Sequence, residues 1–319
     1  MIDQIEKAAR RLSEYLQPTP LVQSTVLDAA GKSVYLKLES LQPTGAFKVR
    51  PALNGMLCHL DQARQNGVVT SSSGNFAQAV AWAAKTLDVD AQIVMMEGAS
   101  AFKRGRTRAL GGTVVLCGNT FQDRWDTTFR IQRESGRVLL HPYDSVETIA
   151  GDGTVGVELL DQTEGDFCVA VPISGGGLIS GIASAVKARR PGCRVVGVQP
   201  AANGSMALSI AQGERVTVTP KPSLADALVV ASPGERTFAI ARDLVDEVVL
   251  VEESELAEGV RFLANEQKIV AEPGGAAGVA ALLAGKIDTR GLNLVCVISG
   301  GNVLPATFAG ILAGTGQSA

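Results

Sequence analysis

Short apolar runs rich in β-branched residues alternate along the chain with alanine-rich stretches. In the longer stretches alanine and leucine repeat every three and four residues, the spacing of one helix face. Strands and helices that alternate in this way indicate a parallel α/β architecture. The predicted strands are residues 34–38, 68–71, 91–95, 113–116, 167–171, 194–198 and 294–298, and the predicted helices include residues 76–87, 180–189 and 274–284.

Length and charge narrow the choice of partners. With 319 residues the chain exceeds the usual size of one domain, so two lobes are expected. The formal net charge is -3, from 29 basic and 32 acidic residues spread along the sequence. This balance gives no electrostatic footprint for nucleic acid or an anionic membrane. A small solute is therefore the expected partner.

The N-terminus and the cysteines indicate a reducing, cytoplasmic location. Residues 1–17 have a charged helical pattern rather than that of an export signal. No apolar run reaches the roughly 20 residues needed to cross a bilayer. The cysteines lack the close spacing of a zinc site or a disulfide framework. They are Cys58, Cys117, Cys168, Cys193 and Cys296.

A glycine loop, Ser-Gly-Gly-Gly-Leu at residues 174–178, lies between an apolar strand and a helix start. Backbone N–H groups in such a loop can converge on an anion, and the helix start adds partial positive charge. The spacing matches neither a dinucleotide fingerprint nor a P-loop, so a smaller phosphate ester fits better. A tight turn without a ligand is the alternative.

Polar residues follow two other predicted strands. The loop Ser72-Ser73-Gly74-Asn75 offers hydroxyls, an amide and N–H groups that could receive a carboxylate, and a plain N-cap is the alternative. Ser299, in the junction at residues 297–303, could give a neutral hydrogen bond. An ordinary turn serine is the alternative there.

Lys48 lies just after a turn, at the start of a predicted helix and next to Phe47. Most lysines are simply solvated. This one shares the chain with a phosphate loop and a carboxylate loop, and an aromatic ring flanks it. The positive end of a helix disfavours an ammonium group, which helps to supply a neutral amine for imine formation.

Taken in this order, the segments resemble the fold type II pyridoxal phosphate enzymes, in particular the branch of threonine/serine dehydratases and serine racemases. The combination is far more specific than any one motif, and it covers nearly the whole chain. The matching segments are Thr19-Pro20-Leu21, Lys37-Leu38-Glu39, residues 44–50, 72–75, 141–144, 151–154, 174–178 and 224–226, Glu272-Pro273 and residues 299–302.

The resemblance implies an α/β fold like that of the tryptophan synthase β chain. Two domains built on open, twisted, parallel sheets would hold pyridoxal 5'-phosphate in the cleft between them. The large domain would comprise residues 1–64 and 142–319, with a small domain inserted at residues 65–141. Only about one helix of sequence follows the last predicted strand, so no C-terminal regulatory domain is expected, and residues 314–319 resemble a loose tail. A homodimer is a family-level expectation.

The resemblance also implies a role for each candidate residue. Lys48 would bind the cofactor covalently, with Phe47 against it. Asn75 would touch its phenolic oxygen and Ser299 its pyridine nitrogen. The remaining contacts would be Gly175, Gly176, Gly177 and Leu178 to the phosphate, and Ser72, Ser73, Asn75 and Phe76 around the substrate carboxylate.

The implied reaction is β-elimination from a β-hydroxy-α-amino acid such as threonine, serine or phenylserine, giving a 2-oxo acid and ammonia. The freed amine of Lys48 would remove the α-proton. A serine at the pyridine nitrogen cannot hold a full positive charge there, which favours loss of the β-substituent over transamination. Ser73 lies where a racemase would place its second acid/base, but dehydratases carry a serine there too. Racemase and β-replacement activities therefore stay as alternatives.

Phe76 and Gln199 depart from the pattern of the branch. Phe76 stands where histidine is common, which suggests an aromatic or bulky β-substituent, as in a phenylserine dehydratase. Packing alone is the alternative. Around Gln199 the acidic pair of the racemase-type metal site is missing, and hard cations favour carboxylates, so no divalent metal is expected.

Other classes of protein fit the sequence less well. A non-catalytic anion-binding protein has no use for Lys48, and a nucleotide-dependent oxidoreductase needs a different glycine spacing. His59 and His141, without a Ser-His-Asp pattern, are expected to be structural. The basic residues of one helical stretch are predicted to form a solvated face. They are Lys103, Arg104, Arg106 and Arg108.

Overall fold

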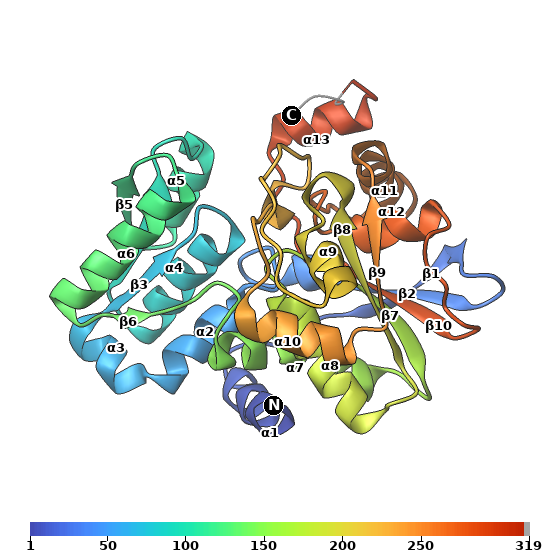
Figure 1. The fold of residues 1–319 in the computed structure, drawn as a ribbon, viewed down its shortest axis with the longest axis horizontal. Coiled ribbons are helices and arrows are strands. Elements are labelled where there is room, and N and C mark those ends of the chain that lie inside the picture. The colour runs from blue at the N-terminus through green and yellow to red at the C-terminus, as the bar shows by residue number, and fades with distance from the viewer. Residues whose placement is uncertain (316–319) are drawn as a thin grey trace.

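The computed structural model describes residues 1–315, which form two separate β-sheets, each packed against helices. Figure 1 shows the smaller sheet with its helices at the left and the larger sheet at the right. No helix in this range is long and apolar enough to cross a membrane. Most of the predicted tail, residues 316–319, lies outside the described residues.

The larger sheet has the strand order β1-β2-β10-β7-β8-β9. Only the pair β1-β2 is antiparallel. Every residue of β7 is buried, as expected for a parallel strand covered by helices on both faces. The strands are β1 (Leu21–Asp28), β2 (Ser33–Lys37), β7 (Phe167–Pro172), β8 (Arg194–Pro200), β9 (Glu247–Val251) and β10 (Asn293–Val297).

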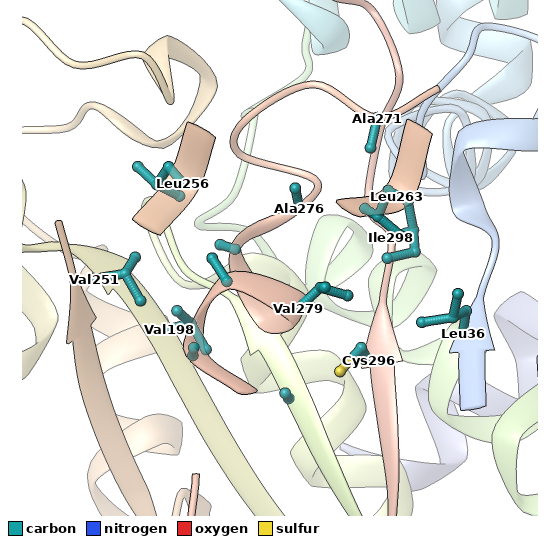
Figure 2. Close-up of a cluster of buried hydrophobic side chains, with 14 of the residues drawn as sticks. Leu36, Val198, Val251, Leu256, Leu263, Ala271, Ala276, Val279, Cys296 and Ile298 are labelled. Atoms are coloured by element: carbon teal, nitrogen blue, oxygen red, sulfur yellow. The ribbon is translucent and has the colours of Figure 1, made fainter. Parts of the chain in front are cut away.

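Helices cover both faces of this sheet. Because side chains alternate along a strand, Cys168 and Ala170 of β7 enter one core while Val169 and Val171 enter another. Figure 2 shows the first core, where Leu256 and Val279 pack toward β8 and β10. The surrounding helices are α1 (Ile2–Leu12), α2 (Val49–Cys58), α7 (Val146–Gln162), α8 (Gly177–Arg189), α9 (Ser205–Gln212), α10 (Glu235–Leu244), α11 (Glu253–Glu266), α12 (Ala277–Leu283) and α13 (Pro305–Leu312).

The smaller sheet is entirely parallel, with the order β5-β4-β3-β6. Alanines of α4 bury one helix face against it, since Ala77, Ala81 and Ala84 share a core with Ile93 and Met95. Its elements are α3 (Leu60–Asn66), β3 (Val68–Ser71), α4 (Asn75–Leu87), β4 (Ala91–Met96), α5 (Ala101–Ala109), β5 (Thr113–Cys117), α6 (Phe121–Ser135) and β6 (Val138–Leu139).

The parallel α/β class predicted from the sequence is confirmed, and all seven predicted strands exist with ends shifted by at most two residues. The strands β1, β6 and β9 were not predicted. β1 is an antiparallel edge strand with mostly exposed residues, and β6 spans only Val138–Leu139. The strands of the smaller sheet fall within residues 65–141, and the domain boundaries themselves stay a prediction.

Candidate active site

A cavity of about 930 Å³ lies between the two sheets. Parallel sheets place ligands outside the carboxyl ends of their strands, and the loops after β3, β7 and β10 all reach this cavity. The structure brings every candidate residue into its wall: Phe47, Lys48, Ser72, Ser73, Asn75, Phe76, Gly175, Gly176, Gly177, Leu178 and Ser299.

Lys48 immediately precedes α2, and its side chain is oriented by the surrounding protein. Its Nζ donates a 2.6 Å hydrogen bond to the carbonyl oxygen of Pro142 and lies 4.9 Å from the ring centre of Phe47. Burial lowers the pKa of the Lys48 amine, against an opposing attraction from Asp152. The amine is therefore more readily neutral, which is the form that attacks a carbonyl.

The glycine loop is shaped as a backbone cradle. β7 ends at Pro172, and α8 begins at Gly177, three residues before the predicted start at Ser180. Gly176 has φ of +98°, and a Cβ there would lie 2.7 Å from Cε of Met206. Glycine is thus required both by the backbone conformation and by the space. The first N–H groups of a helix have no partner within it, so the start of α8 in the cavity wall can receive an anion.

Ser72 and Ser73 lie in the loop between β3 and α4. The Oγ of Ser72 accepts a 3.3 Å hydrogen bond from the N–H of Gly74. The Oγ of Ser73 is buried and has no hydrogen-bond partner within residues 1–315. An unsatisfied buried hydroxyl beside a cavity is suited to contact a ligand, because its desolvation is otherwise uncompensated.

Asn75 is fixed by a chain of side-chain hydrogen bonds. Its Nδ2 donates to Oε1 of Glu272 at 2.6 Å, and its Oδ1 accepts from Nδ2 of Asn302 at 2.9 Å. Burial, followed by the charge of Asp226, raises the pKa of Glu272 to about 7. Both Glu272 and Asn302 occur in segments that carry the family resemblance, but no sequence pattern indicates that they contact Asn75.

Ser299 is 5% exposed and lies two residues beyond the end of β10. Its carbonyl oxygen accepts a 3.0 Å hydrogen bond from the N–H of Phe47, and Ala46 forms an isolated antiparallel bridge with Gly300. These backbone contacts hold the segment Ser299-Gly300 directly against the turn that precedes Lys48.

Phe76 is 2% exposed and packs in the core of the smaller sheet, yet it also lines the cavity. Its ring centre lies 5.6 Å from Nζ of Lys48. Phe76 therefore both packs in the core and faces the cavity, so the two interpretations of this residue are compatible. Four further aromatic side chains that were not predicted line the cavity: Phe102, Phe121, Trp125 and Tyr143.

His141 supports this aromatic wall. Its ring stacks on Trp125 with centres 4.9 Å apart and meets Tyr143 edge to face at 4.7 Å. Its Nδ1 accepts a hydrogen bond from the N–H of Asp144 at 2.8 Å. Burial lowers the pKa of His141 to about 4, so the ring is neutral at physiological pH. These contacts agree with the structural role expected for His141.

The predicted solvated face of basic residues is wrong for Lys103. This residue lines the cavity and forms an ion pair with Asp226. On α5, Lys103 shares a helix face with the fully buried Thr107, four residues along, so its side chain turns inward. Arg106 and Arg108 are exposed, as expected.

The side chain of Gln199 makes a structural contact. Its Oε1 accepts hydrogen bonds from the N–H groups of Met206 and Ala207 at 3.1 and 3.0 Å, at the start of α9. Within residues 1–315 no group of three or more His, Cys, Asp and Glu side chains converges as a metal site. The independence from divalent metal stays a prediction.

A family model described as pyridoxal-phosphate dependent enzyme matches residues 12–300. The chain therefore belongs to this family, and pyridoxal phosphate is its cofactor. The cavity fits that group, since it combines a buried lysine amine, a glycine cradle for an anion and a neutral hydroxyl at Ser299.

Individual relatives place the chain in the branch of threonine/serine dehydratases and serine racemases. L-threonine ammonia-lyase of Thermotoga maritima is 42% identical over 303 residues, 95% of this chain and 75% of the relative. L-threonine dehydratase catabolic TdcB of Staphylococcus aureus is 38% identical over 313 residues, 97% of this chain and 90% of the relative.

Solved structures agree with this placement. Maize serine racemase has a TM-score of 0.92 and 38% identity, covering 98% of this chain and 97% of that one. The threonine deaminase of T.th. has a TM-score of 0.89 and 39% identity, covering 95% of this chain and 98% of that one. The predicted fold type and branch are confirmed.

Proposed function

We propose that this enzyme removes water and then ammonia from a β-hydroxy-α-amino acid, leaving a 2-oxo acid. The observation that carries the proposal is the meeting of the Lys48 amine, the cradle at residues 175–178 and the loop at residues 72–75 in one cavity. Relatives named threonine ammonia-lyase and threonine dehydratase support the same reaction.

Each side chain then has a distinct task. Pyridoxal phosphate, when bound, supplies an electron sink for the charge left on the α-carbon. Lys48 would hold the cofactor covalently, and its amine would remove the α-proton of the substrate. Phe47 would lie against the cofactor ring, and Ser299 would offer the ring nitrogen a neutral hydrogen bond.

The substrate carboxylate lies against the loop between β3 and α4. Ser72, Ser73 and Asn75 bind it through hydroxyl, amide and backbone N–H groups at the start of α4. Phe76 forms the adjoining apolar surface, and Asn75 would also contact the phenolic oxygen of the cofactor. The hydrogen bonds of Asn75 to Glu272 and Asn302 fix its orientation for both contacts.

The proposed substrate carries a bulky or aromatic β-substituent, as phenylserine does. Phe76 supplies an apolar wall close to Lys48, and Phe102, Phe121, Trp125 and Tyr143 extend aromatic surface through the cavity. Apolar contacts of this kind favour a phenyl group over a methyl group by burying more area.

A panel of serine, threonine and phenylserine tests the proposal by the 2-oxo acid formed. We expect product from at least one of them, with the highest kcat/KM for phenylserine. Absence of keto acid across a broad set of β-hydroxy amino acids would overturn the proposed reaction. Keto acid from threonine and serine alone would remove only the proposed preference for an aromatic group.

Amino acid racemisation is a second candidate function. The unpartnered, buried Oγ of Ser73 in the cavity wall favours it, since a racemase needs a second acid/base opposite its lysine. The likeness to maize serine racemase supports it as well. Chiral analysis of recovered amino acid, with and without an added nucleophile, separates racemisation and β-replacement from elimination.

A further inference from the structure

Asp152, on α7, lies beneath the glycine cradle and has no role in the function proposed above. Its side chain is fully buried. A Cβ on Gly177 would lie only 2.5 Å from Oδ2 of Asp152, so the carboxyl group directly adjoins the first residue of α8. Neither carboxyl oxygen has a hydrogen-bond partner within residues 1–315. A buried carboxyl group without partners requires an explanation.

Among the described residues, no neighbouring group compensates the buried carboxyl group of Asp152 by a hydrogen bond. From the start of α2, Lys48 and Arg50 attract its charge, while Glu39 repels it. Arg50 is already hydrogen bonded to Glu39 and Glu158. The other elements that the structure describes around Asp152 place no charged group beside it. The backbone of Tyr143 lies 3.2 Å from the Cβ position of Gly177, and α8 has no ionisable residue before Lys187. Helix α1 contributes the apolar side chain of Ile5, which packs against Gly153.

Burial is the largest influence on Asp152 and raises its pKa to about 7, although Lys48 and Arg50 act in the opposite direction. An ionised carboxylate would repel a phosphate held at the neighbouring N–H groups. Asp152 does not line the cavity, so it acts on such an anion through its charge and not by direct contact. A neutral carboxylic acid removes this repulsion. The two protonation states therefore differ in their effect on an anion in the cradle.

We infer that Asp152 is a positioning residue that stays a neutral acid when the cofactor is bound, so that no negative charge lies directly behind the N–H groups that hold the phosphate at residues 175–178. Phosphate binding then favours the protonated form of Asp152, so cofactor affinity is coupled to a proton. The inference rests on the proposed placement of the phosphate in that cradle.

The test is the dissociation constant of pyridoxal phosphate for the apoenzyme between pH 6 and 9, with Asp152→Asn as the neutral counterpart. Asparagine keeps the size of the side chain but does not titrate. One required proton with a pKa near 7 weakens wild-type binding relative to Asp152→Asn by about tenfold at pH 8 and hardly at pH 6. Asp161→Asn, an exposed change on the same helix, is the matched control and should follow the wild type.

Pyridoxal, which lacks the phosphate, should bind both proteins with the same pH profile. Equal pH profiles of wild type and Asp152→Asn toward pyridoxal phosphate would overturn the inference. Asp152→Ser, with a smaller neutral side chain, serves the same comparison if the asparagine variant does not fold.

Hydrogen exchange separates this inference from the placement of the cofactor. Pyridoxal phosphate should protect the backbone amides of residues 175–178 in the wild type. Protection of these amides without an Asp152-dependent pH profile would contradict the role of Asp152 but not the phosphate site. Absence of protection would contradict the proposed phosphate site itself.

Discussion

The Nζ of Lys48 donates its hydrogen bond to the carbonyl oxygen of Pro142, 94 residues further along the chain. Pro142 comes just after β6, where the chain leaves the smaller sheet, so the amine is held where the two sheets meet. None of the ion pairs within residues 1–315 includes Lys48. A carbonyl acceptor orients the amine without stabilising its charge as a carboxylate would, which agrees with its lowered pKa.

Arg50 should be essential for stability, because it is 2% exposed and bonds both Glu39 and Glu158. Arg50→Met leaves the fully buried Glu39 without its main partner. We expect a loss of about 3–5 kcal/mol in the free energy of unfolding, measured by urea denaturation of the apoenzyme. Arg130→Met, which removes an exposed ion pair with Glu134, is the control and should cost less than about 1 kcal/mol. Similar losses in both variants would refute the importance of this buried network.

Glu272 should make the apoenzyme less stable as pH rises. Its folded pKa of about 7 exceeds the ordinary 4.5, so between these values the folded state binds more protons than the unfolded state, and stability falls with pH. Glu272→Gln should therefore raise the thermal midpoint at pH 8 and leave it nearly unchanged at pH 4. Scanning fluorimetry at both pH values checks this, with the exposed Glu134→Gln as control. An equal shift at both pH values would contradict the protonation argument.

Phe76→His should move substrate preference away from aromatic β-substituents, because it replaces an apolar wall near Lys48 with a polar ring. We expect the ratio of kcat/KM for phenylserine over threonine to fall by about tenfold or more. Phe262→Leu, at a residue that packs against the core of the larger sheet and lies outside the cavity wall, should leave the ratio unchanged. A ratio that is also unchanged in Phe76→His would show that this side chain only packs.

Removal of divalent metal should leave the enzyme active. The side chain of Gln199 caps α9 and carries no charge, so the position that the racemase-type site would use offers no carboxylate. Dialysis against a chelator, followed by assay with and without magnesium or calcium, checks this prediction. Activity that disappears on chelation and returns with either ion would overturn it.

The parts of the site that could be predicted are contiguous in sequence. Gly175 and Gly176 follow a wholly buried strand, and Lys48 follows a tight turn, so each motif carries its own local structure. The core of the larger sheet was predictable for the same reason. Strands such as β7 are continuous apolar runs, whereas the unpredicted β1 exposes most of its residues.

The remaining contacts depend on chain segments that meet only after folding. Asn75 and Glu272 are 197 residues apart, and no local pattern indicates that their side chains bond. Lys103 looked solvated because its neighbours are basic, but its position on α5 turns it toward Asp226. The aromatic wall of the cavity could not be predicted for the same reason, because Phe102 and Trp125 come from different helices and meet only in the folded chain.

Borohydride reduction of the cofactor-loaded enzyme, followed by peptide mass mapping, identifies the lysine that binds the cofactor. Reduction fixes an imine as a stable amine, so the modified lysine can be read from its peptide. We expect a pyridoxyl group on Lys48, and no turnover in Lys48→Ala. A pyridoxyl group on Lys103 or Lys221, which also line the cavity, or a Lys48→Ala enzyme with the native rate, would contradict this expectation.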